Sequence, residues 1–188
     1  ALSGLLVNKL GGPSVMPYQP AGLWDDVVVG APYPGTKYTQ GHGDDLYRRS
    51  MYTFWKRTVP PPALNAFDAP DRESCLLRRP QTNTPLQALV LLNDPTFIEA
   101  SRKLAERMMH EGGSSPRQRI AFLFQLATAH APAADELNVL SDTFARRLAA
   151  YESKPDAAKK RRASGEAKSD PRLDPPELAA YTTVAGML

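Results

Sequence analysis

The sequence predicts a mainly α-helical protein in which an irregular, Pro- and Gly-rich N-terminal half packs on a C-terminal helical bundle. Three observations support this fold class. A capping residue followed directly by proline, a helix-start signal, recurs at residues 84, 94, 115 and 174. Apolar residues follow these starts at three- and four-residue steps. Most of the 18 prolines lie between Pro13 and Pro85, where they favour loops and short elements.

The composition excludes several classes of protein. Hydrophobic residues at 42% and charged residues at 23% are ordinary for a globular chain. The net charge is only +3, much of it from the run at residues 159–162, so nucleic acid is not expected as a partner. No apolar stretch is long enough to cross a bilayer. Cys75 is the only cysteine, so the chain has no internal disulfide and no Cys-x-x-Cys-His haem-attachment site.

The 188 residues are expected to form one domain that is a fragment of a larger protein. The chain opens at Ala1-Leu2 and stops at Met187-Leu188, in both cases within an apolar pattern. Four parts are distinguished by composition: loop-rich residues 1–80 with short helices, a helical core at 81–152, a charged linker at 153–173 and a truncated terminal helix at 174–188.

The N-terminal half is expected to contain two short helices. Ser3 can cap the first, whose apolar side chains end at Leu10. The second starts at Asp44 or Asp45, because aromatic and apolar residues follow at helical steps up to Thr58. A strand is the alternative there, since Tyr, Thr, Phe and Trp also favour strands.

The motif TNTPLQALVLLNDP marks two consecutive helix starts. Thr84 is a suitable N-cap, Pro85 suits the first helical position, and Gln87 completes a capping box. Asn93 can adopt the left-handed conformation that ends a helix. Asp94-Pro95 then starts the next helix, so the sequence predicts a tight break between two helices.

Three further helices are expected after this pair. Ser115-Pro116 starts one that is apolar nearly all round and should therefore be central. Pro132 starts the next. Asp174 and Glu177 form a further capping box at the start of the terminal helix.

The loop motif GHGDD places His42 beside Asp44 and Asp45. These residue types can bind a metal or transfer protons. The simpler interpretation is a polar loop whose aspartate caps the following helix, and we favour it because no second ligand cluster has a recognisable spacing.

Two neighbouring motifs have similar double interpretations. RRSMYTFWKR, which includes Trp55, interleaves basic and aromatic residues and could bind single-stranded nucleic acid or a sugar. An amphipathic helix with buried aromatics is the favoured interpretation.

FDAPDRESCLLRR holds Asp68, Asp71, Arg72 and Cys75. A reactive Cys75 would need a nearby base, so a salt-bridged connector is favoured.

The stretch from Leu46 to Met108, which reads LYRRSMYTFWKRTVPPPALNAFDAPDRESCLLRRPQTNTPLQALVLLNDPTFIEASRKLAERM, resembles the planctomycete PSD domain family, as does SGLLVNKLGGPSVMPYQPAGLWDDV before it. This family is a C-terminal domain of unknown function in cytochrome-c-associated proteins. The resemblance implies an extracytoplasmic protein with haem c in a module upstream of this chain, and no cofactor within it. It supplies no catalytic residues.

The leading hypothesis is a non-catalytic helical scaffold or interaction domain of an exported, cytochrome-c-associated protein. Its expected partners are upstream domains of the same chain or another protein. The alternative is a ligand-binding or hydrolytic domain that acts on polysaccharide. Its cleft would be formed by segments 42–45, 48–57 and 67–79, with the following ligand-binding residues: His42, Asp44, Asp45, Trp55, Asp68, Asp71 and Arg72.

Overall fold

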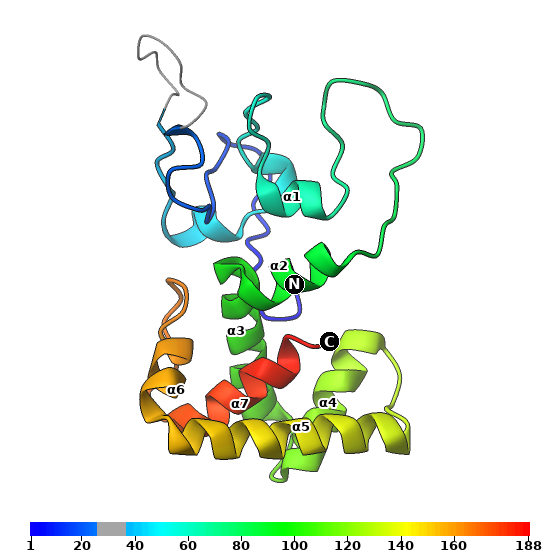
Figure 1. The fold of residues 1–188 in the computed structure, drawn as a ribbon, viewed down its shortest axis with the longest axis vertical. Helices are drawn as coiled ribbons and strands as arrows, with labels where there is room; N and C mark the ends of the chain where they lie inside the picture. Colours follow the sequence, from blue (N-terminus) through cyan, green and yellow to red (C-terminus); the bar gives the residue numbers. More distant parts are fainter. Residues whose placement is uncertain (26–36) are drawn as a thin grey trace. The chain divides into compact units, whose positions relative to one another are not determined.

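Helices account for the named secondary structure of the residues that the computed structural model describes, 1–25 and 37–188. Seven α-helices lie in these ranges: α1 (Pro62–Ala66), α2 (Pro85–Asn93), α3 (Pro95–Glu111), α4 (Pro116–Thr128), α5 (Ala134–Ser153), α6 (Pro155–Arg162) and α7 (Pro175–Ala185). Two short 3-10 helices, η2 (Gly43–Tyr47) and η3 (Ser50–Tyr52), precede them. The predicted mainly α fold class is confirmed (Figure 1).

Contacts divide the chain into two compact units. Unit 1 comprises Ala1–Leu5 and Pro95–Leu188, and unit 2 comprises Leu6–Asp94. The boundary lies between Asp94 and Pro95, whereas the sequence placed the start of the helical core at residue 81. The helix α2 therefore belongs to the loop-rich unit, where it contacts α1.

The helix starts predicted at residues 84, 94, 115 and 174 are present, whereas the helix predicted to start at Pro132 begins at Ala134. The hydroxyl of Thr84 accepts a hydrogen bond from the N–H of Gln87, and the Gln87 side chain accepts one from the N–H of Thr84, so the capping box is complete. The carboxylate of Asp174 accepts from the N–H of Glu177 at 3.0 Å. Glu177 uses its carboxylate to bind Arg119 Nη1 at 2.7 Å. Its side chain thus joins two helices, and the predicted capping box of Asp174 and Glu177 is only half formed.

The break between α2 and α3 differs from its prediction. Asn93 remains the last residue of α2, and Asp94 is extended, with φ −69° and ψ 131°. The prediction of a left-handed Asn93 was wrong. The residue before a proline is sterically restricted to extended conformations, so Pro95 by itself ends α2 at Asn93.

The centre of unit 1 is α7, which contacts α3, α5 and α6 (Figure 1). The buried residues of α7 are Leu178, Ala179, Ala180, Tyr181, Thr182, Val184 and Ala185. Tyr181 stacks on Phe144 with ring centroids 4.2 Å apart. The sequence placed α4 at the centre because of its apolar residues. The small alanines of α7 instead let the neighbouring helices approach closely.

Unit 2 is built on contacts between distant segments. The N–H of Val15 donates to Tyr52 at 2.8 Å, and Phe54 donates to Val15 at 2.8 Å. Trp24 is buried against Tyr38 and Phe54. The predicted helix at residues 3–10 is absent, and the one predicted at 44–58 is reduced to the short 3-10 helices η2 and η3, because residues 7 and 15 pair with residues 48 and 53 through isolated bridges. This pairing supplies hydrogen bonds that a helix would otherwise make.

Segment 153–173, expected as a charged linker, contains α6. Ala158 is fully buried, and α6 contacts α5 and α7. The loop that follows α6 packs on α3 through the buried charges described below.

Candidate functional site

The motif GHGDD forms the start of η2 in unit 2. His42 is the residue before this 3-10 helix, and Asp44 and Asp45 lie in its first turn. Acidic residues in a first turn are favoured by the partial positive charge of the N–H groups there. The interpretation that an aspartate caps this helix is not confirmed, because Asp44 and Asp45 lie inside η2 and no side chain within the described residues makes a capping hydrogen bond at its start.

Trp55 and Arg72 are brought together. The guanidinium carbon of Arg72 lies 4.8 Å from the centroid of the Trp55 ring, within range of a cation–π interaction. Arg72 adopts a left-handed conformation with φ 64°, which is uncommon for a long side chain. One face of Trp55 is thus covered by a side chain of the same unit.

Asp68 and Asp71 bind the backbone of their own loop. Thr82 donates to Asp68 through its N–H at 2.8 Å and through its hydroxyl, and these bonds lower the pKa of Asp68, with a further contribution from Arg79. The N–H groups of Glu73 and Ser74 lower the pKa of Asp71 in the same way. Asp68 also lines a concavity of about 310 Å³.

These pKa directions bear on the chemistry available to the two aspartates. A general acid in glycoside hydrolysis needs a carboxyl whose pKa is raised towards neutrality. Asp68 and Asp71 are both shifted downwards. They are suited to hold a loop as permanent anions.

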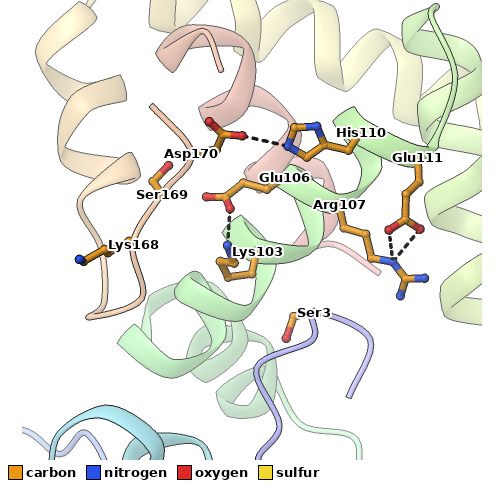
Figure 2. A pocket seen from close by; sticks show the side chains of 9 residues that line it. All are labelled: Ser3, Lys103, Glu106, Arg107, His110, Glu111, Lys168, Ser169 and Asp170. Atoms are coloured by element: carbon orange, nitrogen blue, oxygen red, sulfur yellow. Dashed lines mark hydrogen bonds and ion pairs between the residues drawn. The ribbon is translucent and has the colours of Figure 1, made fainter. Parts of the chain in front are cut away.

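A larger concavity lies on α3 in unit 1 and has a volume of about 470 Å³. Figure 2 shows its polar lining, which comes from α3, from the chain's first residues and from the loop before α7. The lining residues are Ser3, Lys103, Glu106, Arg107, His110, Glu111, Lys168, Ser169 and Asp170.

Ion pairs connect most of the charged groups in this concavity. Lys103 binds Glu106 at 2.5 Å, and Arg107 binds Glu111 at 2.9 Å (Figure 2). Asp170 lies 3.2 Å from His110 Nε2. Arg172 donates to Asp170 from its side chain and its backbone, and together with His110 it holds the pKa of Asp170 well below its usual range.

Beneath this concavity lies a cluster of buried charges. Glu99 and Arg102 are fully buried, and Glu106 is nearly so. Arg102 lies 2.7 Å from Glu106 and 3.7 Å from Glu99. Arg102 also donates to the carbonyl of Ala167 at 2.5 Å, while Glu99 accepts from the N–H of Ala167 at 2.5 Å. Two side chains of α3 thus bind both polar groups of one residue in the loop 163–170.

Gly165 allows this loop to approach α3. Its φ of +80° is in the left-handed region, and a Cβ atom there would lie 2.1 Å from the carboxyl carbon of Glu99. A side chain at residue 165 would therefore displace the loop or the carboxylate.

Sequence reasoning missed this cluster. Glu99, Arg102 and Glu106 are spaced three and four residues apart, which is the visible signal of ion pairing along a helix. The same spacing is typical of solvent-exposed faces, so it does not indicate burial. His110 lies in the last turn of α3, where the helix dipole favours a basic residue, and its contact with Asp170 comes from a loop 60 residues away.

Among residues 1–25 and 37–188, no three His, Cys, Asp or Glu side chains form a group that could hold a metal ion. No helix within the described part of the chain is long and apolar enough to cross a membrane. The chain does not fit covalent haem c, because attachment needs two cysteines and Cys75 is alone.

The fold and these sites define a mainly helical domain whose charged groups chiefly bind one another and the backbone. The chain belongs to the PSD1 family, described as proteins of unknown function (DUF1553), whose family model matches residues 1–144. No curated protein and no solved structure matches it. The matched residues include unit 2 and extend into α5, while α6 and α7 lie beyond them.

Proposed function

We propose that this chain is a non-catalytic helical interaction domain of a longer protein that is exported and associated with cytochrome c. The observation that carries the proposal is the apolar surface of α2. The association with cytochrome c and the export rest on the resemblance to the planctomycete PSD domain family.

The helix α2 exposes leucines that a helix normally buries. None of its nine residues, all within the described part of the chain, is buried. Leu86 and Leu89 are 58% and 56% exposed, and Leu91 and Leu92 are 38% and 43% exposed. Contiguous exposed apolar surface of this kind marks interaction sites in native proteins.

The partner that best fits α2 is an apolar groove on a neighbouring domain of the same longer protein. The sequence of α2, PLQALVLLN, has no charged side chain, so a charged partner surface would lose solvation without gaining an ion pair. An amphipathic or apolar helix that docks in a groove is a recurrent mode of recognition.

The hydrolytic alternative has weaker support. It requires a general acid, which is a carboxyl group with a raised pKa, and an open aromatic face for a sugar ring. The pKa values of Asp68 and Asp71 are lowered, and Arg72 covers one face of Trp55. Turnover of a polysaccharide that is lost in Asp68→Asn would favour this alternative.

The test of the proposal is a pull-down with the full-length protein and with the same protein lacking residues 1–188. The protein lacking residues 1–188, once immobilised, should retain the separate chain of residues 1–188. The double substitution Leu86→Ser/Leu89→Ser in that chain should lower its retention about tenfold. The control is Val139→Ser, which changes a side chain 60% exposed on α5 of the other unit. Circular dichroism should show the same helical content in the wild-type chain, in Leu86→Ser/Leu89→Ser and in Val139→Ser.

Equal retention of the wild-type chain and the Leu86→Ser/Leu89→Ser variant would contradict the proposed role of α2. Stoichiometric haem binding by this chain, seen as a shift of the Soret band, would contradict the assignment of haem to an upstream module. Fractionation of cells that express the full-length protein tests the proposed export separately.

A further inference from the structure

A second concavity in unit 1, with a volume of about 350 Å³, borders the loop after α6. Its lining includes the cationic side chains of Lys159, Arg162 and Lys168. Glu166 is the acidic residue of this lining. Three cations against one carboxylate give the concavity a net positive charge.

Positive charge is concentrated in this part of the chain. Segment 153–173 holds seven basic and three acidic residues, so its net charge of +4 exceeds the +3 of the whole chain. One of the acidic residues, Asp170, already binds Arg172 and His110. Another, Asp156, is almost fully exposed and lies 3.4 Å from Lys159, a geometry typical of a weak surface pair.

The position of α6 explains only part of this charge. Basic residues in a last turn are favoured by the partial negative charge of the terminal carbonyls. Ala163 and Ser164 donate to the carbonyls of Lys159, Lys160 and Arg161, which reduces their repulsion of an anion. Lys168 lies in the loop after α6 and outside its last turn, and it lines this concavity as well as the larger one shown in Figure 2.

The loop that carries Lys168 is held rigidly. Glu99 and Arg102 bind the N–H and the carbonyl of Ala167, the residue directly before Lys168. Buried ion pairs add little net stability compared with apolar packing, so their main effect here is to fix one loop conformation. A preorganised loop binds a ligand with a smaller loss of conformational entropy.

We propose that this concavity binds a phosphate or sulfate group. Lys159, Arg162 and Lys168 donate charge-assisted hydrogen bonds to the tetrahedral oxyanion. Arg162 already donates from Nη2 to the carbonyl of Asp170 at 3.3 Å, and its remaining N–H groups are the donors to the oxyanion. The volume of about 350 Å³ exceeds the needs of one such ion. The concavity therefore has room for the organic part of a phosphate or sulfate monoester.

Isothermal titration calorimetry of the whole chain at low ionic strength tests this site with three probes: inorganic phosphate, inorganic sulfate and glycerol 3-phosphate. Saturable one-to-one binding is expected. Lys168→Ala and Lys159→Ala should each weaken it about tenfold. Lys160→Ala is the matched control, because it removes the same charge from the same helix but does not line the concavity, and it should change the affinity less than twofold.

Gly165→Ala tests the role of the loop without a change of charge. The added Cβ is directed at Glu99 and should displace the loop, which should weaken binding as much as the loss of Lys168 does. Gly4→Ala has a similar φ of +78° with nothing within 4 Å of the added Cβ, so it should bind normally. If Gly165→Ala does not fold, the three lysine variants still decide the question.

The results of these titrations distinguish a specific oxyanion site from non-specific attraction of anions by the basic segment. Equal weakening by Lys159→Ala, Lys160→Ala and Lys168→Ala would overturn the proposal, as would the lack of saturable binding of any probe. Tighter binding of glycerol 3-phosphate than of inorganic phosphate supports a monoester. Equal affinities for glycerol 3-phosphate and inorganic phosphate support a site for the oxyanion. They overturn the proposal that the concavity also binds the organic part of a monoester.

Discussion

Arg102 shows how a single residue organises unit 1. Its side chain is fully buried and contacts the carboxylates of Glu99 and Glu106 on its own helix. It also reaches the carbonyl of Ala167, which is 65 residues away in the sequence. The guanidinium hydrogen-bonds Glu106 and Ala167 and lies 3.7 Å from the Glu99 carboxylate as an ion pair, since it presents several N–H donors and a delocalised charge in a fixed plane.

Replacement of Arg102 should destabilise unit 1 strongly. Arg102→Met preserves most of the side-chain volume but leaves Glu99 and Glu106 buried near each other without their shared cation. We expect a loss of about 3–5 kcal/mol in the free energy of unfolding, measured by urea denaturation. Arg107→Met on the same helix removes an exposed pair with Glu111 and should cost less than about 1 kcal/mol. Equal losses would show that the buried charge of Arg102 contributes no more to stability than the exposed charge of Arg107.

Asp170 predicts a pH dependence of stability. Hydrogen bonds from Arg172, with the charge of His110, lower the pKa of Asp170 in the folded state below the ordinary value of 3.8. The ionised carboxylate therefore stabilises the fold at pH values above 3.8, and this contribution is lost as the pH falls towards the lowered pKa. Asp170→Asn should be less stable than wild type at neutral pH, and the two should converge in acid. Urea denaturation at several pH values measures the difference, and a constant difference would contradict this account.

The helices α7 and α2 begin with similar capping signals but differ in how they pack. Each begins with a capping side chain and a proline. The helix α7 is surrounded by α3, α5 and α6, whereas α2 is exposed. A cap stabilises the helix that it begins, and the consequence for the whole unit depends on how that helix packs.

Removal of the two caps should therefore give different results. Asp174→Ala should lower the free energy of unfolding of unit 1 by about 1 kcal/mol, because α7 lies in its core. Thr84→Ala should increase amide hydrogen exchange within α2 and leave the unfolding of unit 1 unchanged. Asp174→Asn, which can still accept the N–H of Glu177, is the control for the first change. A loss in Asp174→Asn equal to that in Asp174→Ala would show that charge, and not capping, is responsible.

At the scale of the whole molecule, the chain consists of two compact units with different construction. The apolar core of unit 1 lies entirely between Leu104 and Ala185 and joins α3, α4, α5 and α7. Unit 2 has short elements linked by pairing between distant segments, such as residues 15 and 53. A unit with its own apolar core can in principle fold alone.

A fragment of residues 95–188 should accordingly fold without unit 2. We expect a helical circular dichroism spectrum and a single cooperative thermal transition, because the fragment contains the whole core cluster. A shorter fragment of residues 95–170 lacks α7, and with it Leu178, Tyr181 and Val184, so it should not unfold cooperatively. Loss of cooperativity in the longer fragment would show that unit 1 depends on the rest of the chain.

The sequence alone determined the fold class and the helix starts, because caps act over three or four residues. Thr84 with Gln87, Ser115 with Gln118 and Asp174 with Glu177 all pair within one turn. The same local signals failed at residues 44–58, where the bridge to residue 15 outcompeted the predicted helix.

Only the tertiary structure decided which of the charged and apolar side chains are buried. Glu99, Arg102 and Glu106 have the spacing of an exposed ion-pair face, and they are buried because the loop around Ala167 returns to cover them. The leucines of α2 have the composition of a core helix, and they remain exposed. Burial depends on segments that lie far away along the chain, and the pattern of a single helix carries no information about them.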